Sequence, residues 1–275
     1  MSDFSTMELV LLGFGLLTTG ALAGLAAGLL GVGGGIIVVP VLYQLFTSIG
    51  IAEEVRMHVA VGTSLATIVA TSASSMRAHW RHGAIDRSLL LQWLPWILSG
   101  VLVGTALAAV MKGNTLVGLF AAVLLLLSIR MGLGNPSWTI ADKPPVGVLR
   151  AVIGAVIGGL STMMGLGGGS LMVPTLTLFG YHIHRAVGTG SAVGCIIGIP
   201  GAIGFILTGL GTEGLPPFSL GYVSLLGLAL ILPTSMLIAP LGARLAYKLN
   251  TVLLRRAFAV FLALTALKML HSALT

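Results

Sequence analysis

Long apolar runs recur along all 275 residues and constrain the fold more than any other feature of the sequence. A hydrocarbon core of ~30 Å demands about 20 apolar residues of a helix that crosses it, and several runs reach that length. A membrane β-barrel would show alternating strands of about 10 residues instead, and no such alternation is visible. The pattern therefore predicts an all-α polytopic membrane protein with about 8–10 transmembrane segments. The apolar segments fall at about 9–30, 36–50, 58–77, 88–111, 114–132, 147–165, 169–181, 184–209, 218–243 and 251–272.

Composition supports a membrane protein and argues against several other classes. Charged residues make up 8% of the chain and hydrophobic residues 56%, whereas soluble domains carry about 25% charged residues. We interpret the net charge of +7 as loop charge that orients the chain in a bilayer, not as a nucleic-acid surface. The single cysteine, Cys195, excludes an internal disulfide and a cysteine-based metal cluster. Residues 1–8 lack the basic region of a cleavable signal peptide, so we expect the first apolar segment to be retained.

The two halves of the chain repeat each other. The pattern G-x-G-G-G-x4-P occurs at residues 31–40 and again at 165–174, and H-x-A-V-G-T occurs at 58–63 and 184–189. Two further pairs follow in the same order, Pro95 and Gly104 with Pro233 and Gly242, and then Asn114 with Asn250. We therefore expect one membrane domain over 1–275, with repeat one at about 9–133, a linker at about 134–146 and repeat two at about 147–272.

Charge indicates that these repeats have inverted topology. The basic loop 77–88 of the first half corresponds to the acidic loop 210–217 of the second half, so equivalent loops are expected on opposite sides of the membrane. Placing the basic clusters in the cytoplasm puts both termini in the periplasm of a bacterial inner membrane. Each half then makes five crossings, or three crossings and a re-entrant hairpin of short or broken helices at the Gly-rich motif.

The Gly-rich motifs are the leading candidate for a binding site. Glycine permits positive φ and close backbone approach, so each run predicts a break in a helix near mid-membrane. Such a break exposes helix-end N–H groups, whose partial positive charge suits an anion. The alternative is close packing of helices through small residues. A dinucleotide site is disfavoured because no strand precedes either run. The candidate residues are Gly33, Gly34, Gly35, Gly167, Gly168 and Gly169.

Hydroxyl groups supply the other candidate ligands. Donors of this kind bind an oxyanion without a buried cation, although they also bond to their own helix carbonyls. The candidates are Thr63, Ser64, Ser170, Thr189 and Ser191. We interpret His58 and His184 as interfacial anchors in preference to a proton relay, and they are too far apart in sequence to suggest a metal site. No apolar segment holds a central Asp or Glu, so facilitated flux or coupling through His is favoured over strong proton or sodium coupling. No catalytic motif is present, and we expect no enzyme activity, metal or cofactor.

The paired motifs resemble those of the sulfite exporter TauE/SafE family. The stretches that carry the resemblance are GLAAGLLGVGGGIIVVP, GLGGGSLMVP and the two A-V-G-T sequences, and the likeness extends over about residues 10–272. It implies export of small sulfur-containing anions, with Gly33–Gly35, Thr63, Gly167–Gly169 and Thr189 around the path. Ile36 in half one stands where half two has Ser170, so half two would supply more hydroxyl groups.

The sequence thus predicts a transporter, and specifically an exporter, of sulfite or organosulfonates, with its site between the two motifs. An anion channel and a transporter of another small organic anion remain as alternatives. A sulfur-relay enzyme would depend on Cys195, and a sensor would bind the anion without moving it. The expected partners are the small anionic substrate and the lipid bilayer, with no nucleic acid. A monomer and a homodimer are both compatible with the sequence.

Overall fold

Helices form nearly all of the protein. The structure, a computed structural model, describes residues 6–30, 33–133, 139–245 and 251–274. The predicted residues Gly31, Val32, Lys248 and Asn250 lie outside this part of the chain. The helices are α1 (Thr6–Leu30), α2 (Gly35–Ser48), α3 (Glu53–Arg81), α4 (Arg87–Val110), α5 (Gly113–Leu133), α6 (Gly147–Met163), α7 (Gly169–Leu178), α8 (Ile183–Gly209), α9 (Leu225–Leu245) and α10 (Thr251–Leu274).

Five of these helices are long and apolar enough to cross a membrane, namely α3, α4, α5, α8 and α9. Large apolar side chains cover their outer faces, and Leu91, Leu102 and Leu126 are each about 70% exposed. Such extensive apolar exposure suits lipid and not water. The prediction of an all-α polytopic membrane protein is confirmed.

The helices that follow the Gly-rich motifs are short. Helix α2 has 14 residues and α7 has 10. At 1.5 Å per residue they extend over roughly 21 and 15 Å, less than the ~30 Å of a hydrocarbon core. Neither helix can therefore cross the membrane alone, as expected of broken segments.

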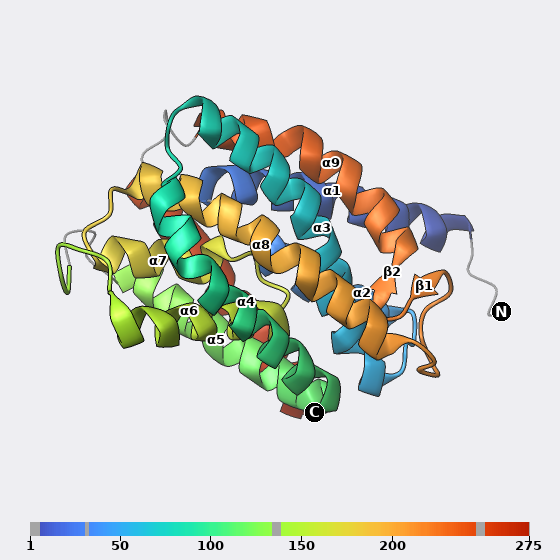
Figure 1. The fold of residues 1–275 in the computed structure, drawn as a ribbon. Coiled ribbons are helices and arrows are strands. Elements are labelled where there is room, and N and C mark those ends of the chain that lie inside the picture. Colours follow the sequence, from blue (N-terminus) through green and yellow to red (C-terminus); the bar gives the residue numbers. More distant parts are fainter. Residues whose placement is uncertain (1–5, 31–32, 134–138, 246–250, 275) are drawn as a thin grey trace.

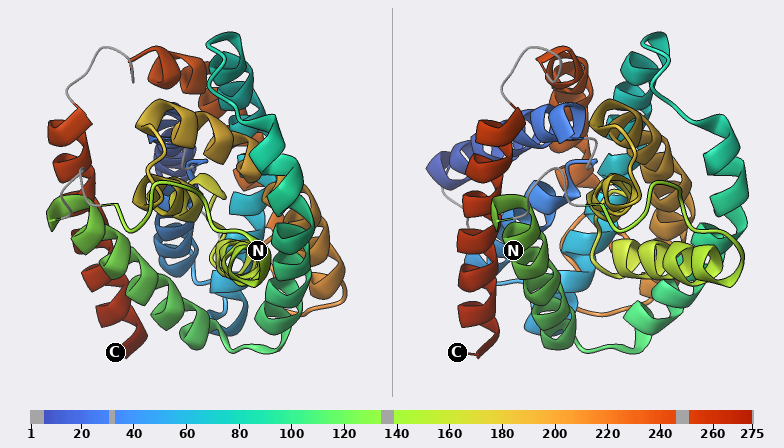
Figure 2. Two further views of the ribbon diagram at one scale, coloured as in Figure 1. Left: turned by 60° about the vertical axis from the view of Figure 1, so that its left-hand side comes forward. Right: turned by 90° about the vertical axis from the view of Figure 1, so that its left-hand side faces the viewer.

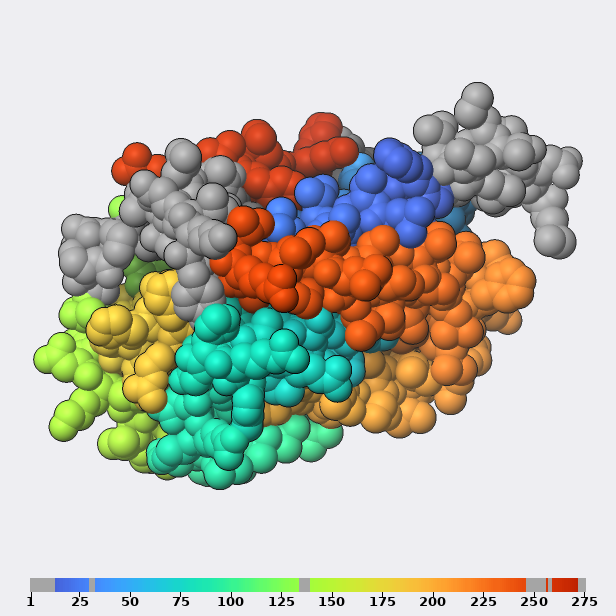
Figure 3. Space-filling model, turned by 90° about the horizontal axis from the view of Figure 1, so that it is seen from above, coloured from blue at the N-terminus to red at the C-terminus, as the bar shows by residue number. Residues whose placement is uncertain are grey.

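Helices from the two halves of the chain are paired. Helix α1 lies along α9, and α6 lies along α4 (Figure 1). At the centre α3 packs against α8, while α5 and α10 lie side by side at one edge of the molecule (Figure 2). In the view from above, α9 fills the space between α1 and the C-terminal part of α3 (Figure 3). Each long contact thus joins residues that are far apart in sequence.

Glycines allow these helices to approach closely. A Cβ atom added to Gly24 of α1 would overlap the backbone of Ser235 in α9. In the same way, a Cβ added to Gly158 of α6 would overlap the carbonyl of Ile97 in α4. Many glycines therefore serve helix packing, as small residues do in other membrane proteins.

Two helix starts differ from the sequence prediction. The segment predicted from residue 218 begins instead with a two-stranded antiparallel hairpin, β1 (Ser219–Leu220) and β2 (Val223–Ser224), and α9 starts only at Leu225. Pro216 and Pro217 cannot donate backbone hydrogen bonds, and Gly221 turns the chain with φ 53°. The helix therefore does not start at residue 218. Helix α3 starts earlier than predicted, at Glu53, where acidic residues favour a helix N-terminus.

Candidate functional site

The two Gly-rich motifs meet at the centre of the molecule. Before α2, Gly33 and Gly34 have φ values of 76° and 81°, and before α7, Gly165 has φ 61°. Only glycine adopts such values without strain, so these residues let the chain reverse at the start of a short helix. A Cβ added to Gly33 would lie 2.8 Å from the Cα of Gly167. The two loops therefore approach each other backbone to backbone.

Helices α3 and α8 enclose the two loops. The Ser64 hydroxyl of α3 donates a hydrogen bond of 2.8 Å to the carbonyl of Gly165. On the other side, a side chain at Gly168 would collide with Val193 of α8. The loop residues described by the structure, 33–35 and 165–170, are all buried. A side chain at Gly35 or Gly168 would therefore push the loops away from these helices.

Ser72 adds a polar group to the centre; it belongs to the run of hydroxyl residues from Thr63 to Ser75 but is not among the predicted ligands. Its side chain is fully buried, and within the described residues its Oγ has no hydrogen-bond partner. A Cβ on Gly33 would lie 3.3 Å from this oxygen, and a Cβ on Gly194 of α8 would overlap it. Leaving a buried hydroxyl unpaired costs about 1–3 kcal/mol, which makes Ser72 a candidate ligand residue beside the loops.

The charge of this centre comes from helix ends. Helix α2 starts at Gly35 and α7 starts at Gly169, so both N-termini lie where the loops meet. Each N-terminus carries a partial charge of roughly +0.5. No ionisable side chain belongs to the loop residues 33–35 or 165–170. The arrangement suits a small anion held by dipoles and hydroxyl groups.

The two predicted threonines have other partners. The Thr63 hydroxyl accepts a hydrogen bond of 2.8 Å from the N–H of Ser224, just before α9. The Thr189 hydroxyl accepts one of 3.1 Å from the N–H of Asp86, just before α4. The side chains of Ser224 and Asp86 in turn accept bonds from the first turns of α9 and α4. These threonines therefore stabilise the starts of α9 and α4, and their hydroxyl groups do not bond to the Gly-rich loops.

The remaining predicted hydroxyl residues lie on either side of the cluster. Ser170 is buried in the first turn of α7, next to Gly169. The Ser191 hydroxyl donates to the carbonyl of Gly188 in its own helix, at 2.7 Å, as the alternative interpretation of such residues anticipated. The structure thus groups Ser64 and Ser170 with the glycines but leaves Ser191 within α8.

His58, which the sequence suggests as an interfacial anchor, is buried within the protein. It is 4% exposed, and its ring lies against Tyr222 at a centroid distance of 5.0 Å. Nδ1 lies 3.1 Å from the carbonyl oxygen of Glu54, and Nε2 lies 3.0 Å from that of Ala108 in α4. The hairpin that carries Tyr222 buries this histidine, whereas His184 is exposed. Within the described residues, no three His, Cys, Asp or Glu side chains are grouped as metal ligands.

An all-helical membrane protein with two short helices meeting at buried glycine loops has the architecture of a membrane transport protein. The chain belongs to the sulfite exporter TauE/SafE family, whose model matches residues 16–269. A probable membrane transporter protein of Haemophilus influenzae is 34% identical over 92% of this chain and 96% of its own length. A probable membrane transporter protein of Methanocaldococcus jannaschii is 29% identical over 93% of this chain and 94% of its own. A third, YunE of Bacillus subtilis, is 28% identical over 70% of this chain and 78% of its own. No solved structure matches the chain.

Proposed function

We propose that the protein exports small sulfur-containing anions, such as sulfite or organosulfonates, through the place where the two Gly-rich loops meet. The observation that carries this proposal is the unpaired, buried Ser72 hydroxyl beside Gly33 and the start of α2. The family membership supports the class of substrate.

Dipoles and hydroxyl groups suit transport better than a buried cation would. An oxyanion accepts hydrogen bonds, and the α2 and α7 N-termini add favourable potential in a medium that screens little. A buried arginine would bind the same anion more tightly and slow its release. The site therefore holds its substrate weakly enough to let it leave on the other side.

The buried position of the loops implies movement during transport. We propose that the halves are inverted repeats that rock against each other to expose the site alternately. The helix pairing supports this. The first helix of each predicted repeat packs on the fourth helix of the other repeat, α1 on α9 and α6 on α4. The contact of α3 with α8, and that of α5 with α10, each join a segment to its own equivalent.

We further propose a bacterial inner-membrane location with both termini in the periplasm. Arg77 and Arg81 from half one line the same pocket as Arg244 from half two. This common location supports placing these basic residues on one side, which the positive-inside rule makes cytoplasmic.

The test of substrate class is flux of labelled sulfite in proteoliposomes, with sulfoacetate, taurine, thiosulfate and sulfate as competitors. Saturable flux that particular sulfonates inhibit is the expected result. Conductance without saturation would favour the alternative of an anion channel. No sulfite or sulfonate flux in folded protein would contradict the proposal.

The test of the site is Ser72→Ala. Since this hydroxyl has no partner in the described protein, its loss should leave thermal stability unchanged or raise it. A lost hydrogen bond to an anion, worth about 1.5–3 kcal/mol, should raise KM roughly 10- to 100-fold. The matched control is Ser75→Ala in the same helix, whose buried hydroxyl bonds to the Ala27 carbonyl at 3.3 Å. That variant should lose stability and keep its KM, and an unchanged KM in Ser72→Ala would refute the site.

A further inference from the structure

A second polar site lies at the C-terminal ends of α3 and α9, where Arg77 and Arg81 follow Ser72 by roughly 8 and 14 Å along α3. It is a pocket of about 220 Å³ between the last turns of these two helices. Its polar lining comes from both halves of the chain. The residues that matter here are Ser74, Arg77, Arg81, His82, Pro240 and Arg244.

The three arginines of this α3–α9 pocket lack protein partners. In the part of the chain that the structure describes, none of their guanidinium groups forms an ion pair or a hydrogen bond. Other arginines do have partners. Arg56 donates to the carbonyl of Ile51 at 2.8 Å, and Arg150 donates to the side chain of Gln92 at 2.6 Å. Three arginines without such partners therefore line one pocket.

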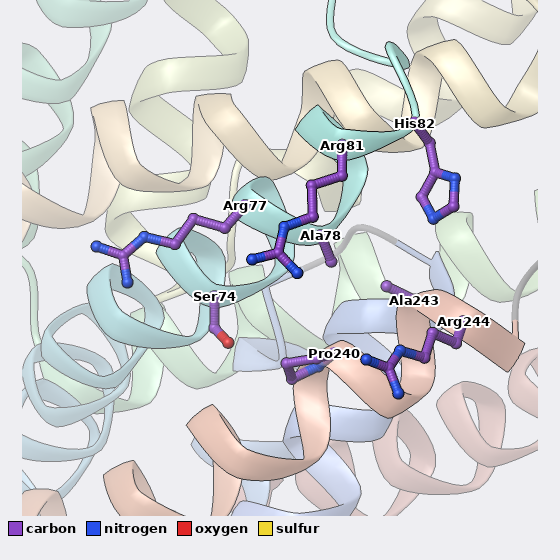
Figure 4. A pocket seen from close by; sticks show the side chains of 8 residues that line it. All are labelled: Ser74, Arg77, Ala78, Arg81, His82, Pro240, Ala243 and Arg244. Carbon is purple, nitrogen blue, oxygen red and sulfur yellow. The ribbon is translucent and has the colours of Figure 1, made fainter.

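Two of these side chains converge. Figure 4 shows Arg81 of α3 and Arg244 of α9 extending from their helices toward the same opening, with the Ser74 hydroxyl at its edge. Arg77 extends to the outer side. Two guanidinium groups that face one opening can each present paired N–H donors to a tetrahedral oxyanion.

The electrostatic potential in the pocket favours an anion, although two helix C-termini with partial negative charge lie beside it. The C-termini of α3 and α9 each contribute roughly −0.5 of a charge. The three arginines carry full positive charges, which outweigh both helix ends, and no Asp or Glu lines the pocket. An anion between Arg81 and Arg244 would reduce the repulsion between these two cations.

The surface beside the pocket is apolar. Leu237 lies one turn before Pro240 and two turns before Arg244, on the same face of α9, and is 73% exposed. An anionic lipid bound by its headgroup at Arg244 would place its acyl chain along Leu237. Basic pockets between membrane helices recognise phosphate headgroups in this manner.

We propose that the α3–α9 pocket binds a phosphate-bearing anion, supplied by an anionic phospholipid headgroup or by free phosphate. This binding is separate from transport at the glycine loops.

The experiment measures binding to the full-length protein in neutral detergent by isothermal titration calorimetry. The probes are short-chain phosphatidylglycerol, short-chain phosphatidylcholine as the uncharged control, and inorganic phosphate. We expect saturable binding of at least one anionic probe and none of phosphatidylcholine. Arg81→Gln and Arg244→Gln should each weaken binding about fivefold, and the double variant about 25-fold.

Matched variants separate this pocket from other sites. Arg256→Gln, which changes an exposed arginine of α10, and Ser72→Ala should both bind as the unmodified protein does. Binding of phosphatidylglycerol alone identifies a lipid as the source, and equal binding of inorganic phosphate identifies the free anion. The proposal fails if neither anionic probe binds, or if a folded double variant binds with unchanged affinity.

Discussion

Buried hydroxyl groups in this membrane protein differ in whether they have a hydrogen-bond partner. The hydroxyls of Thr63 and Thr189 accept from backbone N–H groups that precede α9 and α4. Ser72 is buried without such a partner in the described residues. In sequence these residues look alike, since each is a small hydroxyl residue within an apolar run. Only the fold distinguishes the hydroxyls that accept from the backbone from those, such as Ser72, that have no partner in the described residues.

Replacing either threonine should destabilise the protein without altering its substrate affinity. Thr63→Val or Thr189→Val leaves a backbone N–H without its acceptor, which costs about 1–3 kcal/mol. The control is Thr208→Val, because the exposed Thr208 hydroxyl bonds only within its own helix, to Gly204. Thermal unfolding in detergent measures the first effect and KM for sulfite the second. A raised KM at full stability would instead make these threonines substrate ligands, as the sequence predicted.

Tyr181, in the connection between α7 and α8, should make the free energy of unfolding vary with pH in the alkaline range. Burial, and then its hydrogen bond of 3.0 Å to Asp86, raise the pKa of this phenol above 10.0. A raised pKa means that the neutral form stabilises the fold below pH 10 and that this contribution is lost as the pH rises through the folded pKa. Tyr181→Phe should therefore cost about 1 kcal/mol near neutral pH. The difference in unfolding free energy should shrink above pH 10, and a difference that grows there would contradict this account.

At the scale of elements, hydrophobic periodicity predicted most of the helices. The predicted segments 88–111 and 114–132 correspond closely to α4 and α5. The hairpin at Ser219–Ser224 was missed because its residues are as apolar as a helix start, and only backbone hydrogen bonding distinguishes the two. The repeat implied that the two Gly-rich loops lie together. It did not predict that Gly33 and Gly167 would meet through their backbones alone. The sequence could not distinguish Ser72 from the other hydroxyl residues between Thr63 and Ser75, since its lack of a partner depends on where α8 packs.

Close packing of α1 on α9 predicts a position-specific effect of adding a methyl group. Gly24→Ala places Cβ against the backbone of Ser235, whereas Gly13→Ala in the same helix meets nothing within 4 Å. The first change should lower the free energy of unfolding by about 1–3 kcal/mol. The second should leave it unchanged or raise it slightly, since alanine favours a helix. Equal effects in thermal unfolding would mean that α1 and α9 do not pack as described.

At the scale of the whole molecule, inverted topology predicts which loops share a side of the membrane. In a Cys195→Ala background, Ser88→Cys and Glu213→Cys each add one exposed thiol at equivalent ends of the two halves. A membrane-impermeant maleimide should label the Glu213→Cys protein in intact spheroplasts, and the Ser88→Cys protein only after lysis. Labelling of both from the same side would contradict the inversion.

The pairing of α1 with α9 also has a consequence for how the chain is made. Roughly 200 residues separate the end of α1 from the start of α9, and a ribosome adding about 5–20 residues each second needs about 10–40 s to bridge them. During that interval the glycine-lined face of α1 has no permanent neighbour. During synthesis, lipid or the insertion machinery must therefore cover this face of α1 until α9 has been made.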